Sequence, residues 1–326
     1  MVFVTGGSGL IGSFLIPALL EQGHKVKALY RGQIPDVDGK EQVQWLEGDI
    51  LDPLMLRKAL EGVSFVFHCA GLVSYAPQDK EPLKQVNIEG TANVVDACLE
   101  HGQVKLCHVS SIAAVGRPKG ASVLTEQSKW DVGEEHSAYA NSKYLGELEV
   151  WRGVAEGLNA VIVNPSVVLG PADWNRSSTQ LFKYVYKERP FYTAGSANFV
   201  DVRDVVEAML RLTFSDISGE RFILNAEQLS YKDFFAEVAR NLKRKAPSTK
   251  VPAALAEVVW RLEHARAWLT GGRPLITKDT ARVARKTHLF SNVKIRKAIG
   301  LEFRPLSETI AWASNQLLQS VPVTAR

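Results

Sequence analysis

Short runs of apolar and β-branched residues alternate with longer amphipathic segments along the first two thirds of the chain. The short runs predict strands, because they are too short for helices and are bounded by glycine, proline or polar residues. They lie at residues 2–5, 25–30, 43–46, 63–68, 104–109, 160–163 and 221–224. Between them, apolar residues at helical spacing predict helices near 10–22, 53–61, 81–101, 139–156 and 205–212. This order predicts right-handed βαβ crossovers, and hence an α/β fold with a doubly wound parallel sheet.

A glycine-rich turn, TGGSGLIG at residues 5–12, joins the first predicted strand to the first predicted helix. A helix N-terminus offers unpaired N–H groups and about half a positive charge, which suit a phosphate. The spacing fits both GxxGxxG and GxGxxG, with Gly6 at the sharp turn, Gly9 at the close approach and Gly12 where helix packs on strand. Such a turn can be a plain loop, but the flanking strand and helix favour a dinucleotide site in a Rossmann-type sheet.

The end of the second predicted strand bears on the choice of dinucleotide. An acidic residue there holds the ribose 2′-hydroxyl of NAD, whereas an arginine accommodates the 2′-phosphate of NADP. This chain has Arg31 after Tyr30 and no acidic residue until Asp36. Because a guanidinium binds phosphate and a carboxylate repels it, we expect NADP(H) rather than NAD(H). The alternative is that Arg31 is only a solvent-exposed loop residue.

A tyrosine and a lysine one helical turn apart are candidates for chemistry. Tyr139 and Lys143 open a predicted helix and so share one of its faces. A phenol has a pKa of about 10, and lowering it by ~3 units requires ~4 kcal/mol, which a neighbouring ammonium and an oxidised nicotinamide could supply. Ser111, at the end of the fifth predicted strand, could hydrogen-bond a substrate carbonyl. The Tyr–Lys spacing alone is close to chance; its place behind the glycine-rich turn makes it informative.

With these landmarks in this order, the chain resembles the extended short-chain dehydrogenases/reductases, the NAD-dependent epimerase/dehydratase family. Within that family its pattern is most similar to the dihydroflavonol-reductase and 3β-hydroxysteroid-dehydrogenase branch. Dehydratases of the family carry Asp-Glu after the catalytic hydroxyl, whereas this chain has Ile112-Ala113, which argues against dehydration. The segments that carry the resemblance are TGGSGLIG (5–12), GDI (48–50), HCAG (68–71), VNIEGT (86–91), VSS (109–111), YANSK (139–143), NPSVVLGP (164–171) and NFVDVRD (198–204).

The resemblance implies roles for individual residues. Tyr139 would be the catalytic acid/base, Lys143 its partner and Ser111 the hydroxyl that orients the carbonyl. The residues expected at the cofactor, including an adenine contact at Asp49 and an organising role for Asn87, are Gly6, Gly9, Leu10, Ile11, Gly12, Arg31, Asp49, Ile50, Ala70, Gly71, Asn87, Tyr139, Lys143, Pro165, Ser166 and Val168. The residues expected to face the substrate are Ser74, Tyr75, Trp174 and Phe182.

Beyond residue 169 the periodicity is interrupted. Residues 171–198 are rich in aromatic side chains, which could line an apolar pocket or fill a small core. Later segments are predicted to be mostly helical, with Asp204 as the N-cap of one helix and 252–269 as an amphipathic surface helix. We therefore expect a dinucleotide-binding domain and a smaller, mostly helical substrate domain, formed by 1–169 plus 199–226 and by 170–198 plus 227–326, respectively.

The expected activity is hydride transfer between NADP(H) and a carbonyl or secondary alcohol of a mostly apolar small molecule. One alternative is a sugar-nucleotide epimerase that keeps NAD tightly bound. Another is a dinucleotide-binding regulator without turnover. The specificity of such folds lies in their variable later third, so the sequence leaves the substrate open.

Composition adds boundaries to this picture. The chain has 326 residues, 46% of them hydrophobic, and a formal charge of +4, which we interpret as solvated helix faces and not as a nucleic-acid surface. Its three scattered cysteines predict a reducing, cytoplasmic setting without disulfides or a metal site. We expect no targeting peptide and no membrane span, since 252–269 carries too many charges. A homodimer could form through the helices near 81–101 and 138–156.

Overall fold

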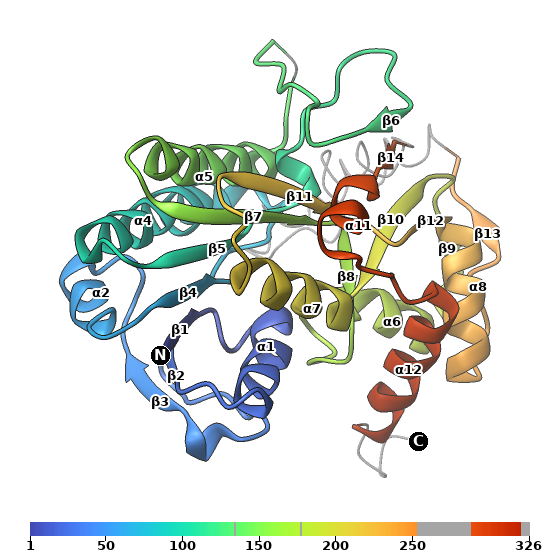
Figure 1. The fold of residues 1–326 in the computed structure, drawn as a ribbon. Helices are drawn as coiled ribbons and strands as arrows, with labels where there is room; N and C mark the ends of the chain where they lie inside the picture. Colours follow the sequence, from blue (N-terminus) through green and yellow to red (C-terminus); the bar gives the residue numbers. More distant parts are fainter. Residues whose placement is uncertain (134, 177, 253–287, 321–326) are drawn as a thin grey trace.

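The computed structural model describes residues 1–133, 135–176, 178–252 and 288–320. Its centre is a seven-stranded sheet in which every neighbouring pair is parallel (Figure 1). The strands are β1 (Val2–Thr5), β2 (Val26–Tyr30), β3 (Gln44–Glu47), β4 (Phe65–His68), β5 (Lys105–Val109), β7 (Asn159–Pro165) and β11 (Glu220–Leu224). Their order is β11-β7-β5-β4-β1-β2-β3, so the predicted doubly wound parallel sheet is confirmed.

The strand order reverses between β1 and β4. From β1 the chain proceeds outward through β2 and β3, and it then crosses to β4 and continues through β5, β7 and β11 in the opposite direction. In open parallel sheets, the crevice at the carboxyl ends of the two strands flanking such a reversal is where ligands bind. The glycine-rich turn leaves the sheet at this edge, directly after β1.

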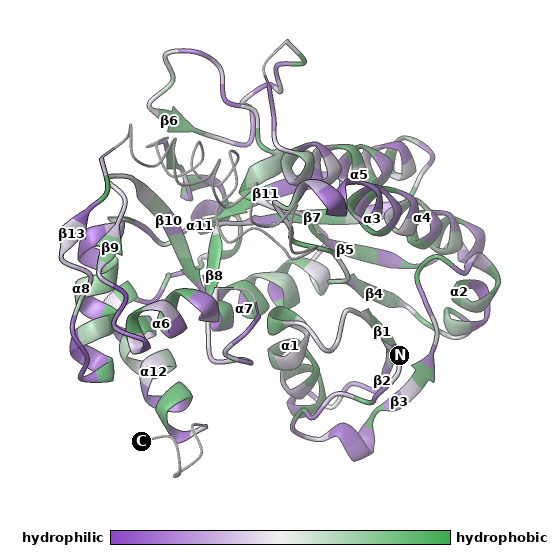
Figure 2. Cartoon of the chain, turned by 180° about the vertical axis from the view of Figure 1, so that it is seen from behind, coloured by the Kyte–Doolittle hydropathy of each residue, from purple (hydrophilic) through white to green (hydrophobic). Residues whose placement is uncertain are grey.

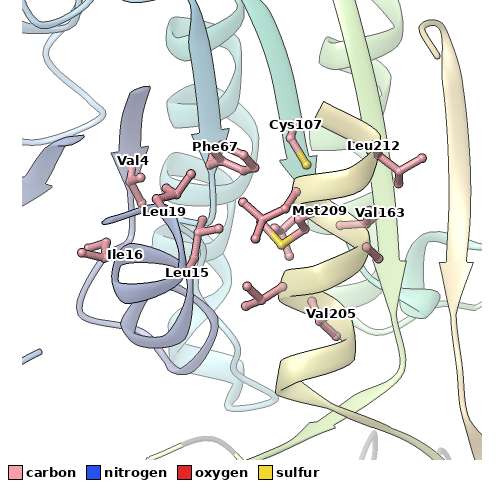
Figure 3. Close-up of a cluster of buried hydrophobic side chains, with 14 of the residues drawn as sticks. Val4, Leu15, Ile16, Leu19, Phe67, Cys107, Val163, Val205, Met209 and Leu212 are labelled. Carbon is pink, nitrogen blue, oxygen red and sulfur yellow. The ribbon is translucent and has the colours of Figure 1, made fainter. Parts of the chain in front are cut away.

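Helices cover both faces of the sheet (Figures 1 and 2). One face carries α1 (Leu10–Glu21) and α7 (Val202–Thr213), with α11 (Val293–Ile299) beside α7; the other carries α2 (Pro53–Ala59), α4 (Gly90–His101) and α5 (Ala138–Ala155). Alternate strand residues enter opposite cores: Val2 and Val4 pack with α1 and α7, whereas Phe3 packs with α2, α4 and α5. Figure 3 shows the first of these cores. Burial on both faces explains why the strands are continuous apolar runs.

A second, three-stranded sheet lies beyond β7. It is formed by β8 (Val167–Leu169), β10 (Ser196–Asp201) and β12 (Glu227–Ser230), in the order β12-β10-β8. Its core is shared with α6 (Thr179–Tyr186), α8 (Tyr231–Leu242) and α12 (Leu306–Gln319). Two short pairs complete the described strands: β9 (Phe191–Tyr192) with β13 (Thr249–Lys250), and β6 (Val123–Leu124) with β14 (Leu289–Phe290). The domain boundaries stay a prediction.

Two predicted helices differ from those found. The predicted helix at 81–101 is interrupted: α3 (Lys80–Lys84) passes into a π-helical turn, η3 (Gln85–Glu89), before α4. The prediction that Asp204 caps the next helix is wrong, because Asp201 accepts the N-terminal hydrogen bond of α7 from the Arg203 amide, 2.7 Å away. Asp204 lies inside the helix, fully buried, and accepts from the Arg304 amide at 2.9 Å. The predicted helix at 252–269 falls almost wholly outside the described residues.

Candidate active site

The turn between β1 and α1 is as tight as its glycines predict. Gly6 has a φ of +72°, and a Cβ placed there would lie 2.5 Å from the Ala70 amide nitrogen. A Cβ on Gly12 would lie 2.3 Å from the Gly6 carbonyl oxygen. Gly9 is the N-cap of α1, and none of the described side chains caps that helix. The turn therefore presents the first amide groups of α1, at Leu10 and Ile11, to the crevice with no side chain in competition.

Arg31, the residue expected to bind a 2′-phosphate, already forms an ion pair with a carboxylate. Arg31 Nη1 lies 2.9 Å from Asp49 Oδ2, and the two side chains are 69% and 36% exposed. Both residues were expected at the cofactor, Arg31 at a 2′-phosphate and Asp49 at adenine. The structure brings them together at the carboxyl ends of β2 and β3. A 2′-phosphate would therefore have to share the guanidinium with Asp49.

The three residues predicted for catalysis converge. Tyr139 and Lys143 lie in the first turns of α5, with only 8% and 6% of their surfaces exposed. Ser111, which follows β5, hydrogen-bonds the Tyr139 hydroxyl, and this contact acts to lower the pKa of Tyr139. The Lys143 Nζ atom donates to the Val109 carbonyl oxygen at 2.8 Å. It also lies near Gly71, where an added Cβ would be 3.7 Å from it. A phenol, an ammonium and a hydroxyl thus meet at the edge where β4 and β5 end.

The pKa of Tyr139 does not follow the expectation from Lys143. Burial raises the pKa of Tyr139 above its ordinary value, and the Ser111 hydrogen bond opposes this only in part. Burial also lowers the pKa of Lys143 to about 8, while Glu147 opposes that shift. The lowered phenol pKa expected from Lys143 is therefore not found. The second expected source of a lowered phenol pKa, the positive ring of an oxidised nicotinamide, is left to supply this effect.

Asn87 connects three parts of the site. It lies in the π-helical turn η3, where its side chain accepts from the Leu72 amide at 2.8 Å and donates to the Leu72 carbonyl at 2.9 Å. Its Nδ2 also donates to the Ser142 hydroxyl in α5 at 2.9 Å. A Cβ on Gly146 would lie only 2.1 Å from the Asn87 carbonyl oxygen, so η3 and α5 pack backbone against backbone. The organising role expected for Asn87 has this geometric basis.

The loop after β4 borders the catalytic residues, as expected for a segment that faces the substrate. The Tyr75 ring packs on the Tyr139 ring in an edge-on arrangement, with centroids 5.5 Å apart. The Ser74 hydroxyl donates to Asp79 at 2.6 Å and so helps to shape the loop. Among the residues expected at the substrate, Tyr75 is therefore in contact with Tyr139.

The aromatic residues after 171 mostly fill a core. Phe182 is fully buried and packs against Phe234 of α8, so here it fills a core, and its contact with a substrate stays a prediction. Trp174 packs on Tyr186 with centroids 5.1 Å apart, and its Nε1 donates to the Ser320 hydroxyl at 3.2 Å. These side chains lie at the border of the core formed by α6, α8 and α12. Of the two interpretations left open by the sequence, core filling is the one found for Phe182.

Other predicted cofactor residues surround the same edge. Ile50 follows β3, and Ala70 and Gly71 follow β4. Pro165 ends β7, and Val168 lies in β8. The Ser166 hydroxyl, between them, is buried and hydrogen-bonds no other described group, so it is available to a ligand.

Sequence reasoning missed a buried ion pair at this site. Glu147, one helical turn after Lys143, is 2% exposed, and its Oε1 lies 2.9 Å from Arg221 Nη1 in β11. The spacing of four residues from Lys143 was a signal that could have singled out Glu147. A cavity of about 640 Å³ lies beside this pair, with Trp130, Tyr144 and Trp151 in its lining, but it includes none of the three predicted catalytic residues.

The described residues limit other kinds of site. They contain no group of three His, Cys, Asp or Glu side chains able to hold a metal ion. Within the same part of the chain, no helix combines the length and apolar character needed to cross a bilayer. Cys69, Cys98 and Cys107 are free thiols.

A glycine-rich turn at the strand reversal, beside a Ser, Tyr and Lys cluster, invites comparison with known proteins. The family described as the NAD dependent epimerase/dehydratase family matches residues 2–223. The chain belongs to this family. A crystal structure of the protein gox2253 superposes with a TM-score of 0.82 at 31% identity and covers 98% of both chains.

Two curated members of the family are similar over nearly their whole length. One, from Synechocystis sp., carries the provisional name dihydroflavonol 4-reductase and is 30% identical over 317 residues, which cover 95% of this chain and 92% of that protein. The other, sterol demethylase protein B of Methylococcus capsulatus, is 29% identical over 319 residues, which cover 95% of this chain and 95% of that protein. The comparisons establish an enzyme of the extended short-chain dehydrogenase/reductase type with a nicotinamide dinucleotide cofactor.

Proposed function

We propose that this protein is an NADP(H)-dependent oxidoreductase that interconverts a carbonyl and a secondary alcohol on a mostly apolar small molecule. The observation that carries the proposal is the meeting of Ser111, Tyr139 and Lys143 at the carboxyl edge of the sheet, next to the strand reversal. The names of the similar proteins, a dihydroflavonol reductase and a sterol demethylase protein, support a reductive reaction and an apolar substrate. The free cysteines support a reducing, cytoplasmic setting.

The residues at the β1–α1 turn fit a dinucleotide. The uncapped N-terminus of α1 would hold the pyrophosphate through the amides of Leu10 and Ile11, since a phosphate suits the positive end of a helix. Asp49 and Ile50 would lie at the adenosine end, with Arg31 beside the 2′-phosphate. Ser166 would lie toward the nicotinamide end, where its buried hydroxyl has no other described partner.

The three converging residues divide the work of carbonyl reduction. The hydroxyls of Ser111 and Tyr139 bind the carbonyl oxygen, and Tyr139 gives its proton to that oxygen as negative charge develops there. Lys143 would bind ribose hydroxyls, and the positive ring of an oxidised nicotinamide would favour the phenolate that Tyr139 becomes. The dinucleotide, when bound, supplies the hydride. Tyr75, in ring contact with Tyr139, would exclude water from one side of the reacting group.

The test is a Tyr139→Phe variant assayed by NADPH absorbance against a panel of aldehydes and ketones. Loss of the proton donor should reduce kcat by about 10²- to 10⁴-fold while NADPH binding is retained. Tyr184→Phe is the matched control, because the Tyr184 hydroxyl only donates to the Phe191 carbonyl, away from the site. Activity of Tyr139→Phe within a few-fold of the wild type would reject the proposed role.

Cofactor content, NADPH turnover and melting temperature of the same purified protein distinguish the two alternative functions. Stoichiometric NAD(H) retained through purification, without turnover of free NADPH, would favour a sugar-nucleotide epimerase. A rise of the melting temperature on NADPH addition, without turnover of any carbonyl compound, would favour a dinucleotide-binding regulator. A homodimer through α4 and α5 is also part of the proposal.

A further inference from the structure

Glu147 is a buried carboxylate that the proposed reaction does not use. It lies one helical turn after Lys143 in α5, and Arg221 of β11 neutralises it across 2.9 Å. The Ser110 hydroxyl and the Asn164 amide each donate to its other oxygen at 2.7 Å. A buried carboxylate is costly unless it is paired and hydrogen-bonded. Trp151 Nε1 also donates to the oxygen that faces Arg221, at 3.3 Å, so an ion pair and three neutral donors meet that condition.

The partners of Glu147 lead to the catalytic serine. Ser110 directly precedes Ser111 at the end of β5. Asn164, in β7, uses the same Nδ2 to donate to the main-chain oxygen of Ser111 at 3.0 Å. Glu147 is therefore the acceptor that joins the ends of two neighbouring strands to the helix that carries the other two catalytic residues.

We propose that Glu147 is a positioning residue for the catalytic centre. Its carboxylate fixes the strand end that carries Ser111 relative to α5, and its negative charge keeps Lys143 in the ammonium form near neutral pH. Arg221 is the counter-ion that allows this carboxylate to stay charged in the interior. The inference rests on the proposed function, because it assigns Glu147 a role in a reaction that uses these residues.

The surroundings of Lys143 explain why a nearby carboxylate matters. Burial lowers the pKa of Lys143 to about 8, and among the groups that oppose this the Glu147 carboxylate is the largest, followed by Cys69. His68 and His108 face Lys143 from β4 and β5, and burial lowers the pKa of both, to about 3 for His68. Both imidazoles are thus neutral at pH 7, and burial raises the pKa of the Cys69 thiol, which stays protonated.

On its own helix, Lys143 also has Tyr139 one turn before it, and burial keeps that phenol in its neutral form by raising its pKa. Glu147 is therefore the anionic side chain that favours a proton on Lys143. Without its charge, the pKa of Lys143 would fall further, and the ammonium would be lost as the pH rises toward neutrality.

The charge of Glu147 can be removed with little change of shape in Glu147→Gln, and Glu147→Asp is a control that keeps the charge. Competitive acetylation with acetic anhydride between about pH 6 and about pH 10, read by mass spectrometry of the peptide containing Lys143, measures the ionisation of Lys143 without a substrate. The wild-type midpoint should lie near 8. We expect the midpoint to fall by about one pH unit in Glu147→Gln and to change little in Glu147→Asp.

NADPH turnover provides the second readout. Near pH 8, Glu147→Gln should lower kcat by about 10-fold or more with little change in the KM for NADPH, and its alkaline limb should move with the labelling midpoint. Equal midpoints in the wild type and Glu147→Gln would overturn the proposal. If the midpoint is lowered in Glu147→Gln but the wild type turns over no carbonyl compound, the coupling of Glu147 to Lys143 is supported. The proposed oxidoreductase function is then rejected.

Glu147→Gln leaves Arg221 without its counter-ion, and this can prevent folding. The double variant Glu147→Gln/Arg221→Met removes both charges. Its midpoint should also lie below that of the wild type, because Glu147 lies one helical turn from Lys143 on α5, whereas Arg221 lies on β11. A wild-type midpoint in the folded double variant would overturn the proposal equally.

Discussion

Gly146 and Gly153 are both buried in α5, but a methyl group would meet different obstacles at the two positions. At Gly146 it would lie 2.1 Å from the Asn87 carbonyl oxygen, where ordinary contacts begin at 3.4 Å. The backbone of η3 or α5 would therefore have to move by more than an ångström. At Gly153 it would meet the Val95 and Leu158 side chains at 2.6 and 3.0 Å, and both side chains can rotate.

These contacts predict different outcomes for the same substitution. Alanine gains about 1 kcal/mol of helix propensity over glycine at either position. Overpacking against a backbone costs toward the upper end of about 1–3 kcal/mol, so Gly146→Ala should lose about 2 kcal/mol of stability. Gly153→Ala should change stability by less than about 1 kcal/mol, since a strained rotamer costs about as much as alanine gains.

The two variants should also differ in catalysis. Movement of η3 displaces Asn87, which holds Leu72 and Ser142, and a misplacement of about 1 Å can cost up to about 10²-fold in rate. We expect kcat/KM to fall by about 10- to 100-fold in Gly146→Ala and by less than about 3-fold in Gly153→Ala. Thermal unfolding and NADPH turnover measure both effects. Equal melting temperatures and equal kcat/KM in the two variants would refute this reasoning.

Four further substitutions test other contacts. Arg31→Ala should raise the KM for NADPH by about 10-fold and the KM for NADH by much less. Asp49→Asn frees the Arg31 guanidinium and should raise the preference for NADPH by up to about 5-fold. An equal change for both dinucleotides would show that Arg31 does not bind the phosphate. Gly12→Ala should abolish the rise in melting temperature on adding NADPH, because its Cβ would overlap the Gly6 carbonyl. Phe182→Ala should cost about 3–5 kcal/mol of stability without changing the substrate KM, and a changed KM would place Phe182 at the substrate after all.

The main sheet and the meeting of Ser111, Tyr139 and Lys143 follow from local patterns. Continuous apolar runs marked the parallel strands, and such strands all deliver their following residues to one edge. Ser111 and Gly6 could therefore be placed near each other without knowledge of any contact. Tyr139 and Lys143 needed only the geometry of a helix to share a face.

What escaped prediction depends on partners far away in the sequence. Phe182 and Tyr75 are both aromatic residues in segments whose sequence shows no clear periodicity. Phe234 of α8, more than fifty residues after Phe182, is what buries Phe182. Asp201 and Asp204 are equally good N-cap residues by type, and Arg304 decides between them by claiming Asp204. Local pattern carries no information on such long-range choices.

The π-helical turn acts as a phase shift within one long helix. Asn87 precedes Val94 by seven residues, which in an uninterrupted α-helix correspond to about 700° of rotation. The Asn87 side chain would then point within about 20° of the direction in which Val94 faces the sheet. The wide turn rotates it toward Leu72 and Ser142 instead. Deleting Gln85 or Val86, before Asn87, would keep that spacing and give a more regular and more easily formed helix in which the Asn87 amide points at the hydrophobic core. The irregularity is thus a stability cost retained where straightening would disconnect the loop after β4 from α5.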